Sequence, residues 1–428
     1  MKEILPIGKA TEDAILDAAG YLNNHRALAD VEDGCKPSYR RMIWAALQFP
    51  KGELQPSVQL INRMASYHPH SLDGCTGLLA SMVRSGIMTG KGSFGFTSIL
   101  GDEKPAAAPR YTKTRLSDLW YNSISPLMQC IEKVESPVGP LECKKIGVVF
   151  PLCLSFRGLV AGIGFGISTV YPNFSPKSLY LAYKNNNPNL LEPNINILID
   201  KKNSELDKLW TKGKGRVIYS YKVSPYTSED GKKGFLFEGD TDIFTPNLKK
   251  IYKLVEAGHV FVEDMTDAKG PKLFIGLVSG RGITLQDLEK LCRQCCWDGT
   301  TYQLNVTSGE TCFRIPLQSW LDYTYKNYIK LLNDVTAKKM EKLKFDLEVQ
   351  LAIPKIAEII LNNPKVTDKE IIDKTGYSKE IIGEVLKKPL SLLRKKDTSE
   401  KIKELKEKIN ELKKFDPEEY TKNLVEKL

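Results

Sequence analysis

The sequence GKGSFGFTSILGDEKPAAAPRYTKTRL, residues 90–116, is the stretch around which the chain is organised. It opens with glycines, passes through the small-residue run 105–109, and places Arg110 beside Tyr111. Small residues leave room for the backbone of another molecule to approach closely. An arginine can clamp a phosphate, and a neighbouring phenol can act as a nucleophile. A surface loop with a packed tyrosine is the commoner explanation for one such stretch, so the rest of the chain must decide.

The composition is that of an ordinary globular protein. The 428 residues are 42% hydrophobic and 27% charged, and this length predicts about two to four domains. No apolar run reaches membrane-spanning length, and the N-terminus lacks the form of a signal peptide. We therefore expect no membrane association and a cytoplasmic location. The net charge of +10 permits a polyanionic partner without locating it.

Nine scattered cysteines indicate reduced thiols rather than a disulfide framework. Cys292, Cys295 and Cys296 include one CxxC spacing, but no second pair completes a zinc site. Two interpretations stay open: a metal site, or buried thiols on a helix over 283–296. The second is favoured.

Basic residues gather around a turn that follows a predicted helix over 9–30. Asp33-Gly34 marks the turn, and Pro37 suits the first turn of the next helix. The N-terminus of a helix favours anions. The cations in this region are Arg26, Lys36, Arg40 and Arg41. They predict phosphate contacts, with a solvated basic face as the alternative.

Two short helices, over 58–65 and 74–84, and a strand over 96–100 are typical of a helix-turn-helix with a wing. His68 and His70 lie between the helices. They are either a metal pair that lacks a third ligand or donors to phosphate.

Four motifs now stand in fixed order: DGCKPSYRR, YHPH, GSFG, and GD…AAAPRYTKTRL. Together they resemble the breakage-reunion subunit of type IIA DNA topoisomerases, the group that contains the gyrase A and topoisomerase IV A-type subunits. Within that group the chain is most similar to the medium subunit of T4-type bacteriophage enzymes. Four positions in these motifs depart from the family pattern: Ser71 and Leu72 replace glycine and aspartate, Asp73 stands at the position of a serine that contacts drugs in family members, and Tyr39 replaces histidine.

The resemblance implies a multidomain α+β fold. Its expected parts are an N-terminal arm (1–25), a winged-helix breakage-reunion domain (26–145), an α/β tower domain (146–317), and a coiled-coil arm with a C-terminal dimerisation gate (318–428).

The residues of the C-terminal part support an antiparallel coiled coil. A long helix over 318–352 is expected to stop at Pro354, and short helical segments are expected over 355–362 and 379–394. A returning helix begins at Asp397, with Glu400 as its capping partner. Its apolar stripe, at heptad spacing, consists of Ile402, Leu405, Ile409 and Leu412.

The resemblance also marks DNA contacts in the tower. Family members insert an isoleucine between base pairs from the segment that corresponds to AGIGFGISTVYPNFSP. The aligned position is Tyr171, with Val170 as a neighbouring candidate, and an apolar wedge can unstack a base step. Lys214 and Arg216, in the glycine turn GKGRV, are expected to bind phosphates of bent DNA.

The chemistry expected from the resemblance is reversible DNA cleavage. Tyr111 is the expected nucleophile, forming a 5′-phosphotyrosyl ester, and Arg110 stabilises charge on the phosphate. Lys113 and Arg115 are expected to bind DNA beside them. His68 and His70 would position DNA or assist proton transfer.

The sequence shows no acidic cluster of DxD form beside a distant glutamate that would build a magnesium site, and no Walker A motif. The resemblance places Mg²⁺ and ATP mainly on a separate large subunit with ATPase and TOPRIM domains. The expected assembly is a homodimer through the C-terminal gate, joined by two large subunits in a heterotetramer on double-stranded DNA.

Two other classes of function are possible. A DNA-bending scaffold would keep the fold without the chemistry, and the Arg110-Tyr111 pair argues against it. A tyrosine recombinase or single-strand topoisomerase would not share this order of motifs.

Overall fold

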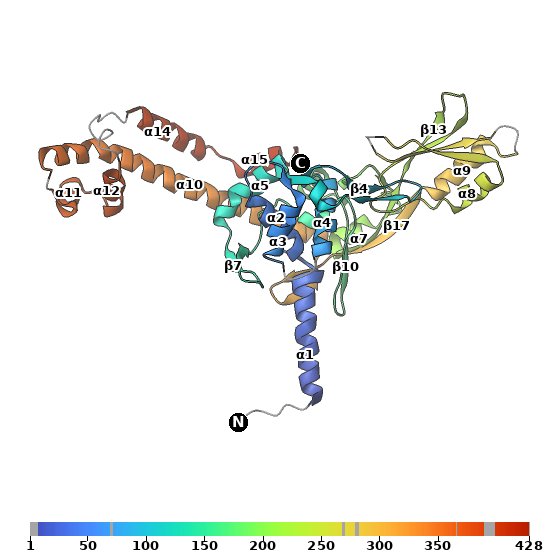
Figure 1. Ribbon diagram of the computed structural model, residues 1–428, viewed down its shortest axis with the longest axis horizontal. Helices are drawn as coiled ribbons and strands as arrows, with labels where there is room; N and C mark the ends of the chain where they lie inside the picture. The colour runs from blue at the N-terminus through green and yellow to red at the C-terminus, as the bar shows by residue number, and fades with distance from the viewer. Residues whose placement is uncertain are drawn as a thin grey trace. The chain divides into compact units, whose positions relative to one another are not determined.

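The computed structural model describes residues 7–68, 72–267, 270–278, 282–364, 366–388 and 399–427 (Figure 1). The chain divides into two compact units, Met1–Tyr328 with Leu424–Leu428, and Ile329–Asn423. The described residues form helices and several small sheets, so the predicted mixed α+β class is confirmed. The four predicted domains and their boundaries stay predictions.

The first unit begins with four helices, α1 (Ile7–Leu22), α2 (Pro37–Leu47), α3 (Ser57–Ala65) and α4 (Leu72–Arg84). A π-helical turn, Asn23–Ala27, follows α1. Helix α2 starts at Pro37, as predicted, because proline has no N–H to leave unpaired in the first turn. Its Met42, Ile43 and Ala45 are fully buried and anchor it in the core.

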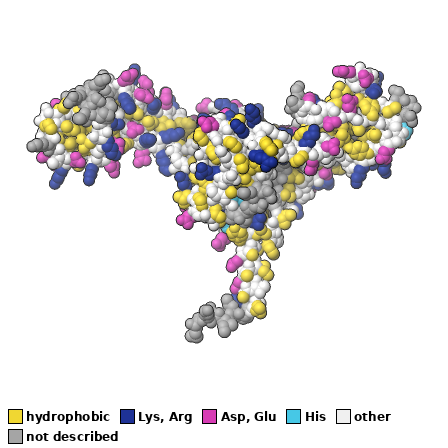
Figure 2. Space-filling model, in the orientation of Figure 1, with side chains coloured by type: hydrophobic (Ala, Val, Ile, Leu, Met, Phe, Trp, Pro, Cys, Tyr) yellow, Lys and Arg dark blue, Asp and Glu magenta, His cyan; other side chains and the backbone are white. Residues whose placement is uncertain are grey.

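Helix α1 is shorter than the predicted helix over 9–30, and none of its residues is buried. Ile15 and Leu16 are 51% and 62% exposed, and Figure 2 shows hydrophobic side chains along it. A helix of this length gains little stability from propensity alone.

Small antiparallel sheets surround the Arg110-Tyr111 motif. Strands β2 (Gln55–Pro56), β6 (Lys113–Leu116) and β3 (Met88–Lys91) form one sheet in that order. Strands β4 (Phe94–Thr97) and β5 (Glu103–Ala106) form a hairpin. Helix α5 (Asp118–Ile124) and the hairpin of β7 (Lys133–Glu135) and β8 (Leu141–Cys143) follow.

A five-stranded antiparallel sheet has the order β11-β12-β17-β10-β9. Its strands are β9 (Val160–Ile163), β10 (Ser168–Tyr171), β11 (Leu198–Ile199), β12 (Lys214–Ser220) and β17 (Trp297–Gln303). Helices α6 (Pro176–Lys184) and α7 (Leu206–Lys212) lie between β10 and β12 in the chain. A further sheet joins β1 (Ala29–Asp30), β18 (Asn305–Ser308) and β19 (Thr311–Arg314).

A four-stranded antiparallel sheet has the order β13-β14-β16-β15. Its strands are β13 (Lys222–Thr227), β14 (Lys233–Glu238), β15 (Val260–Asp264) and β16 (Lys272–Leu277). Helices α8 (Lys249–Glu256) and α9 (Leu285–Cys295) share its core. That core contains Cys292, Cys295 and Cys296, which confirms the interpretation of buried thiols, and burial raises the pKa of Cys292 to about 12.

The long C-terminal helix corrects one prediction. Helix α10 (Leu317–Asn362) continues through Pro354 instead of ending before it. An internal proline removes one helical hydrogen bond and crowds the preceding turn. Burial of Ile353, Ile356 and Ala357 around it stabilises the helix against this cost.

The apolar cluster of the second unit is built from helices that follow one another in the chain. Helices α11 (Asp368–Thr375) and α12 (Lys379–Leu386) pack with the last part of α10, and α11 was not predicted. Helices α14 (Ser399–Lys413) and α15 (Pro417–Val425) follow. Leu405 and Ile409 of the heptad stripe are buried. The predicted cap at Asp397 and the helical prediction over 389–394 lie outside the described residues.

No helix in the described parts of the chain is both long and apolar enough to cross a membrane.

Candidate functional site

Tyr111 is presented at the surface by a single 3₁₀ turn, Pro109–Tyr111. Its side chain is 71% exposed, an unusual environment for a large aromatic residue. The guanidinium carbon of Arg110 lies 4.8 Å from the centroid of the Tyr111 ring. The phenol and a permanent positive charge are therefore adjacent, and both are accessible to a large ligand.

The next residue fixes this turn to the core. Thr112 is 2% exposed, and its hydroxyl donates to the Ser57 hydroxyl at 2.7 Å. The Ser57 N–H donates to the Thr112 carbonyl at 3.0 Å. Gly92 has φ +112°, and a Cβ there would lie 2.9 Å from Thr112 Cγ2. The glycine-rich turn therefore packs directly against Thr112, the residue that precedes strand β6.

Strand β6 separates polar from buried side chains by its alternation. Lys113 is exposed, whereas Thr114 and Leu116 are buried. Arg115 is partly buried and forms two hydrogen bonds with Asp118, at 2.6 and 2.8 Å. In this structure the Arg115 guanidinium therefore points toward Asp118 of the same chain.

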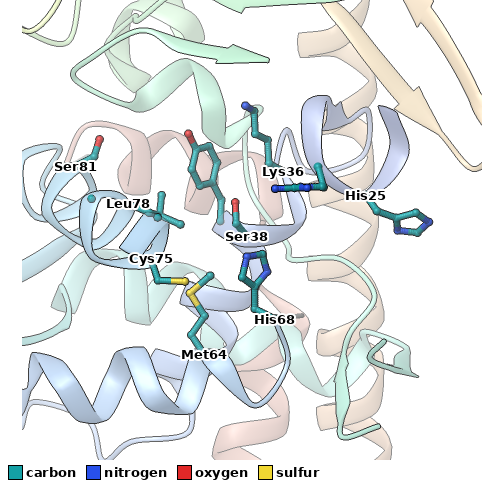
Figure 3. Close-up of a pocket in the computed structure, with 12 residues that line it drawn as sticks. His25, Lys36, Ser38, Met64, His68, Cys75, Leu78 and Ser81 are labelled. Carbon is teal, nitrogen blue, oxygen red and sulfur yellow. The ribbon is translucent and has the colours of Figure 1, made fainter. Parts of the chain in front are cut away.

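A second group of predicted residues lines a groove of about 480 Å³ (Figure 3). The predicted DNA-binding residues in its lining are Arg26, Lys36 and His68, joined by His25 and Tyr39. Figure 3 shows His68 between Ser38 and Met64, with Cys75 and Leu78 of α4 on one side. Neither Arg110 nor Tyr111 belongs to this lining.

The polar groups of this groove differ in character. Arg26 is exposed on the π-helical turn. The Lys36 ammonium donates to the carbonyl of Ala161, and burial lowers its pKa. The pKa of His25 is also lowered, first by burial and then by the charge of Arg41.

Arg40 and Arg41 each form an ion pair with a carboxylate of the chain. Arg40 donates to both carboxylate oxygens of Asp33, at 2.7 and 2.9 Å. Arg41 donates to both carboxylate oxygens of Glu142, at 2.7 and 2.9 Å. Such bidentate pairs occupy the face of the guanidinium that would grip a phosphate. In this structure both arginines are internal partners of carboxylates, and their expected role as direct phosphate contacts stays a prediction.

Tyr171, the expected intercalating wedge, is buried in this structure, so its role as a wedge stays a prediction. Its side chain is 0% exposed. Its hydroxyl accepts from the Ala29 N–H at 3.0 Å and donates to the Asn305 carbonyl. It lies on the buried side of β10, since side chains alternate along a strand and Thr169 is buried with it. Val170, the neighbouring candidate, is partly buried in β10.

The same segment exposes another residue that the sequence interpretation missed. Ile163, at the end of β9, is 84% exposed, and Phe165 beyond it is 57% exposed. Asn23 holds this hairpin tip by accepting from the Phe165 N–H at 2.8 Å and donating to its carbonyl at 3.2 Å. The GIGFG pattern was the available signal, because an apolar residue between glycines at a hairpin tip cannot be buried by its neighbours.

Lys214 and Arg216 lie on the exposed face of β12. Arg216 packs over Gly299, where a Cβ would meet its Nε at 2.4 Å. Arg314 of β19 is also exposed and donates to Gln303 at 3.3 Å. Gln303 pairs with Lys214 in the sheet, so Arg314 adds a third cation to this face.

His70 lies outside the described residues. Among the residues that are described, no three His, Cys, Asp or Glu side chains are arranged to hold a metal ion.

Comparison with known proteins now identifies the family. The family model for the A-type subunits of DNA gyrase and topoisomerase IV matches residues 26–428. The chain belongs to this family.

Individual relatives match over shorter stretches. The chain is 30% identical over 197 residues to DNA topoisomerase 2 of Crithidia fasciculata, covering 43% of this chain and 15% of that protein. It is 28% identical over 259 residues to the DNA gyrase A protein of Thermotoga maritima, covering 54% and 31%. It is 31% identical over 197 residues to the DNA topoisomerase 4 A protein of Rickettsia conorii, covering 42% and 24%. The matched part spans less than a third of each relative.

Proposed function

We propose that this chain is the DNA cleavage and religation subunit of an ATP-dependent type II DNA topoisomerase. The observation that carries the proposal is the exposed Tyr111 with the Arg110 guanidinium against its ring. Family membership supports the same class of activity. A phenol set out at the surface, next to a fixed positive charge, suits attack on a bulky polyanion better than it suits packing.

In the proposed reaction, the Tyr111 oxygen attacks a DNA phosphodiester. The bond from phosphorus to the 3′ oxygen breaks, the phenol gives up its proton, and the departing 3′ oxygen gains one. The product is a 5′-phosphotyrosyl ester, and the reverse reaction reseals the strand without an external energy source. Arg110 stabilises the charge that develops on the phosphate oxygens.

Two copies of the chain are needed to cut both strands. We propose a homodimer through the C-terminal gate, which opens a double-strand break for passage of a second duplex. The winged-helix, tower and coiled-coil domains predicted from the sequence belong to this proposal.

We further propose that magnesium and ATP are held mainly by a large ATPase/TOPRIM subunit, giving a heterotetramer. Magnesium would supply charge stabilisation during phosphoryl transfer. The closeness to T4-type bacteriophage medium subunits, inferred from the four motifs, is part of the same proposal, as is a location in the cytoplasm or nucleoid of a host.

Exposed cations define where the bound duplex would run. Arg26, Lys113, Lys214 and Arg216 are exposed in the structure. Together with Lys36, Arg40, Arg41, His68, His70 and Arg115, we propose them as the DNA-binding set. Beside Tyr171 and Val170, we propose Ile163 as a further candidate for the wedge, because its apolar side chain is already exposed and could enter a base step.

The test is cleavage of supercoiled plasmid by the chain together with Mg²⁺ and its large subunit, stopped with detergent. The proposal expects protein-linked linear DNA from the wild type and none from Tyr111→Phe. Equal cleavage by both would exclude Tyr111. DNA binding without cleavage by the wild-type assembly would favour the non-catalytic scaffold.

A further inference from the structure

The loop that joins β4 to β5 is buried in a core built from a later part of the chain. Ile99, in this loop, is 2% exposed and belongs to the apolar core of the four-stranded sheet with α8 and α9. The other described buried residues of that core lie between Tyr221 and Cys296. Leu100 packs against the same core. The hairpin that precedes Tyr111 is therefore anchored in a sheet that follows much later in the sequence.

The tip of this hairpin has a defined conformation. The N–H groups of Gly101 and Ser98 donate to the carbonyls of Ser98 and Asp102, each at 3.0 Å. The Asp102 N–H donates to the Ser98 hydroxyl at 3.1 Å. Gly101 has φ +91°, a conformation that residues with a side chain rarely adopt. These contacts close the tip into a tight turn, so Ile99 is held on a rigid support.

Strand β4 is attached at both ends to the segment that follows β14. At the end of β4, the Thr241 hydroxyl donates to the Thr97 carbonyl at 2.7 Å. At its start, Arg84 NH1 donates to the Phe94 carbonyl at 3.0 Å, and the Arg84 guanidinium lies 3.5 Å from the Asp242 carboxylate. These polar contacts lie beside the apolar anchor, so the hairpin and the four-stranded sheet are joined at several points.

The same segment is tied to the strand that carries two of the proposed DNA contacts. Tyr221 directly follows β12, the strand of Lys214 and Arg216. Its side chain is 2% exposed in the core of the four-stranded sheet. Its hydroxyl lies 3.0 and 2.7 Å from the carbonyl oxygens of Asp240 and Phe244. DNA held on β12 would therefore act on the core in which the hairpin is anchored.

Strand β5 connects this anchor to the turn of Tyr111. It is paired with β4, and residues 107–108 alone separate it from the turn Pro109–Tyr111. The Ala107 N–H donates to the Ser93 carbonyl at 3.0 Å, which extends the pairing toward the turn. Because hydrogen-bonded strands move together, a displacement of the hairpin tip would displace the turn as well.

We propose that Ile99 is a positioning residue for cleavage: it fixes the β4–β5 hairpin in the core of the four-stranded sheet, and the hairpin holds the Tyr111 turn in place for attack on DNA. The role in cleavage rests on the proposed function, whereas the mechanical link between core and turn does not. The competing explanation is that Ile99 only stabilises the core, as any buried apolar residue does. Ile251 of α8 separates the two explanations, because it is 0% exposed in the same core but lies outside the hairpin.

The first experiment measures the link in the full chain without a partner. Hydrogen exchange, followed by mass spectrometry, reports the opening of peptides that cover residues 103–112. Ile99→Ala should speed exchange there by about tenfold or more, because loss of the anchor lets the hairpin open. Ile251→Ala is the matched control and should speed exchange in the four-stranded sheet but not over 103–112. Unchanged exchange over 103–112 in folded Ile99→Ala, or an equal rise in Ile251→Ala, would overturn the proposal.

A milder variant covers the case in which Ile99→Ala does not fold. Thr241→Val keeps the shape of the side chain but removes the donor to the Thr97 carbonyl. Exchange over 103–112 should rise by about three- to tenfold, the range for one lost hydrogen bond. Thr266→Val is the control, because the Thr266 hydroxyl donates to Asp264 of β15 instead, and it should leave that exchange unchanged. Equal exchange over 103–112 in Thr241→Val and the wild type would overturn the proposal.

The second experiment measures single-turnover cleavage by the assembled enzyme. Ile99→Ala should cleave roughly 10- to 100-fold more slowly with DNA affinity changed less than about threefold, because a misplaced nucleophile loses rate while binding persists. Ile99→Val keeps an apolar anchor and should regain most of the rate, and Ile251→Ala should cleave like the wild type. A wild-type rate for folded Ile99→Ala, or an equal loss in Ile251→Ala, would overturn the positioning role. An inactive wild-type assembly would refute the proposed function and leave the exchange result valid.

Discussion

At the scale of single residues, the account depends on what surrounds Tyr111. The ring is exposed, its backbone N–H donates to the Ala108 carbonyl at 2.9 Å, and Arg110 lies on its face. The proximity of a fixed cation lowers the energy of a developing anion at that place. We therefore expect Arg110 to increase the rate of DNA cleavage.

Arg110→Ala should reduce the rate of DNA cleavage by roughly 10²- to 10³-fold, the usual loss when one stabiliser of transition-state charge is removed. Single-turnover cleavage of an oligonucleotide duplex by the assembled enzyme measures it. Arg110→Lys keeps the charge but loses the planar guanidinium, so its cleavage rate should lie between those of the wild type and Arg110→Ala. A wild-type rate for Arg110→Ala would show that Arg110 has no part in the reaction.

His25 should titrate below 6.5, its ordinary pKa, because burial and the charge of Arg41 disfavour the imidazolium. Since the folded-state pKa is below the unfolded one, the stability contributed by this group is present above about pH 6.5. It is lost as the pH falls through the folded-state pKa. NMR titration measures the midpoint.

Arg41→Gln should raise the midpoint of His25, since it removes the positive charge that opposes protonation. Glu132→Gln is the control and should leave it in place. A His25 midpoint at or above 6.5 in the wild type would contradict the electrostatics described for the groove.

At the scale of elements, the hairpin of β9 and β10 joins the proposed wedge to the groove. Gly162 has no room for a side chain, because a Cβ would lie 1.9 Å from the Ala27 carbonyl. Asn23 holds Phe165 by two hydrogen bonds, and Lys36 donates to Ala161. The hairpin tip is thereby held against the turn that carries Arg26.

Ile163→Ala should reduce DNA bending, because the apolar wedge that unstacks a base step is removed. Asn23→Ala should also reduce DNA bending, because it removes the two hydrogen bonds that hold the hairpin tip. Energy transfer between dyes at the two ends of a bound duplex measures the bend. Ile15→Ala, at an exposed position of α1, is the matched control. Full bending by Ile163→Ala would exclude this wedge.

The helices of the second unit offer a separate test of packing. Ile382 of α12 is 1% exposed in a cluster with Ile353 and Ile371. Ile382→Ala should lower the free energy of unfolding by about 2–5 kcal/mol, as is usual for such buried truncations. Urea denaturation measures it. Leu386→Ala, at a position 40% exposed on the same helix, should cost much less, and equal losses would refute this description of the core.

Features determined by neighbouring residues could be predicted from the sequence, whereas contacts between distant residues could not. The start of α2 at Pro37 and the turn at Tyr111 are determined by residues within a few positions in the sequence, so local patterns predict them. The pairing of Arg41 with Glu142 spans 101 residues and has no local signal. Helix α10 passes Pro354 because tertiary burial outweighs the local penalty. The burial of Tyr171 follows from the alternation along β10 and from its contact with Asn305, which is far from it in sequence.

At the scale of the whole molecule, the chain carries parts of a proposed site in separate places. Tyr111 and Arg110 stand on one turn, while Arg26, Lys36 and His68 line the groove. The described residues supply no cluster of metal ligands. In the proposed assembly, a second copy and a large subunit join these parts on one DNA duplex.

The assembly leads to a simple prediction about activity. The chain alone should bind double-stranded DNA but should not cleave it at a measurable rate, and addition of the large subunit with Mg²⁺ should start cleavage. Electrophoretic shift and plasmid cleavage, measured on the same preparations, test it. Efficient cleavage by the highly purified chain alone would contradict the proposed dependence on a partner.

The most direct test of the central claim is to identify the covalent bond itself. The assembled enzyme is stopped with detergent during cleavage, the DNA and protein are digested, and the remaining nucleotide-linked peptide is sequenced by mass spectrometry. The account predicts a single modified residue, Tyr111, joined through its oxygen to a 5′ phosphate. A DNA adduct on any other side chain, or on a 3′ phosphate, would contradict it.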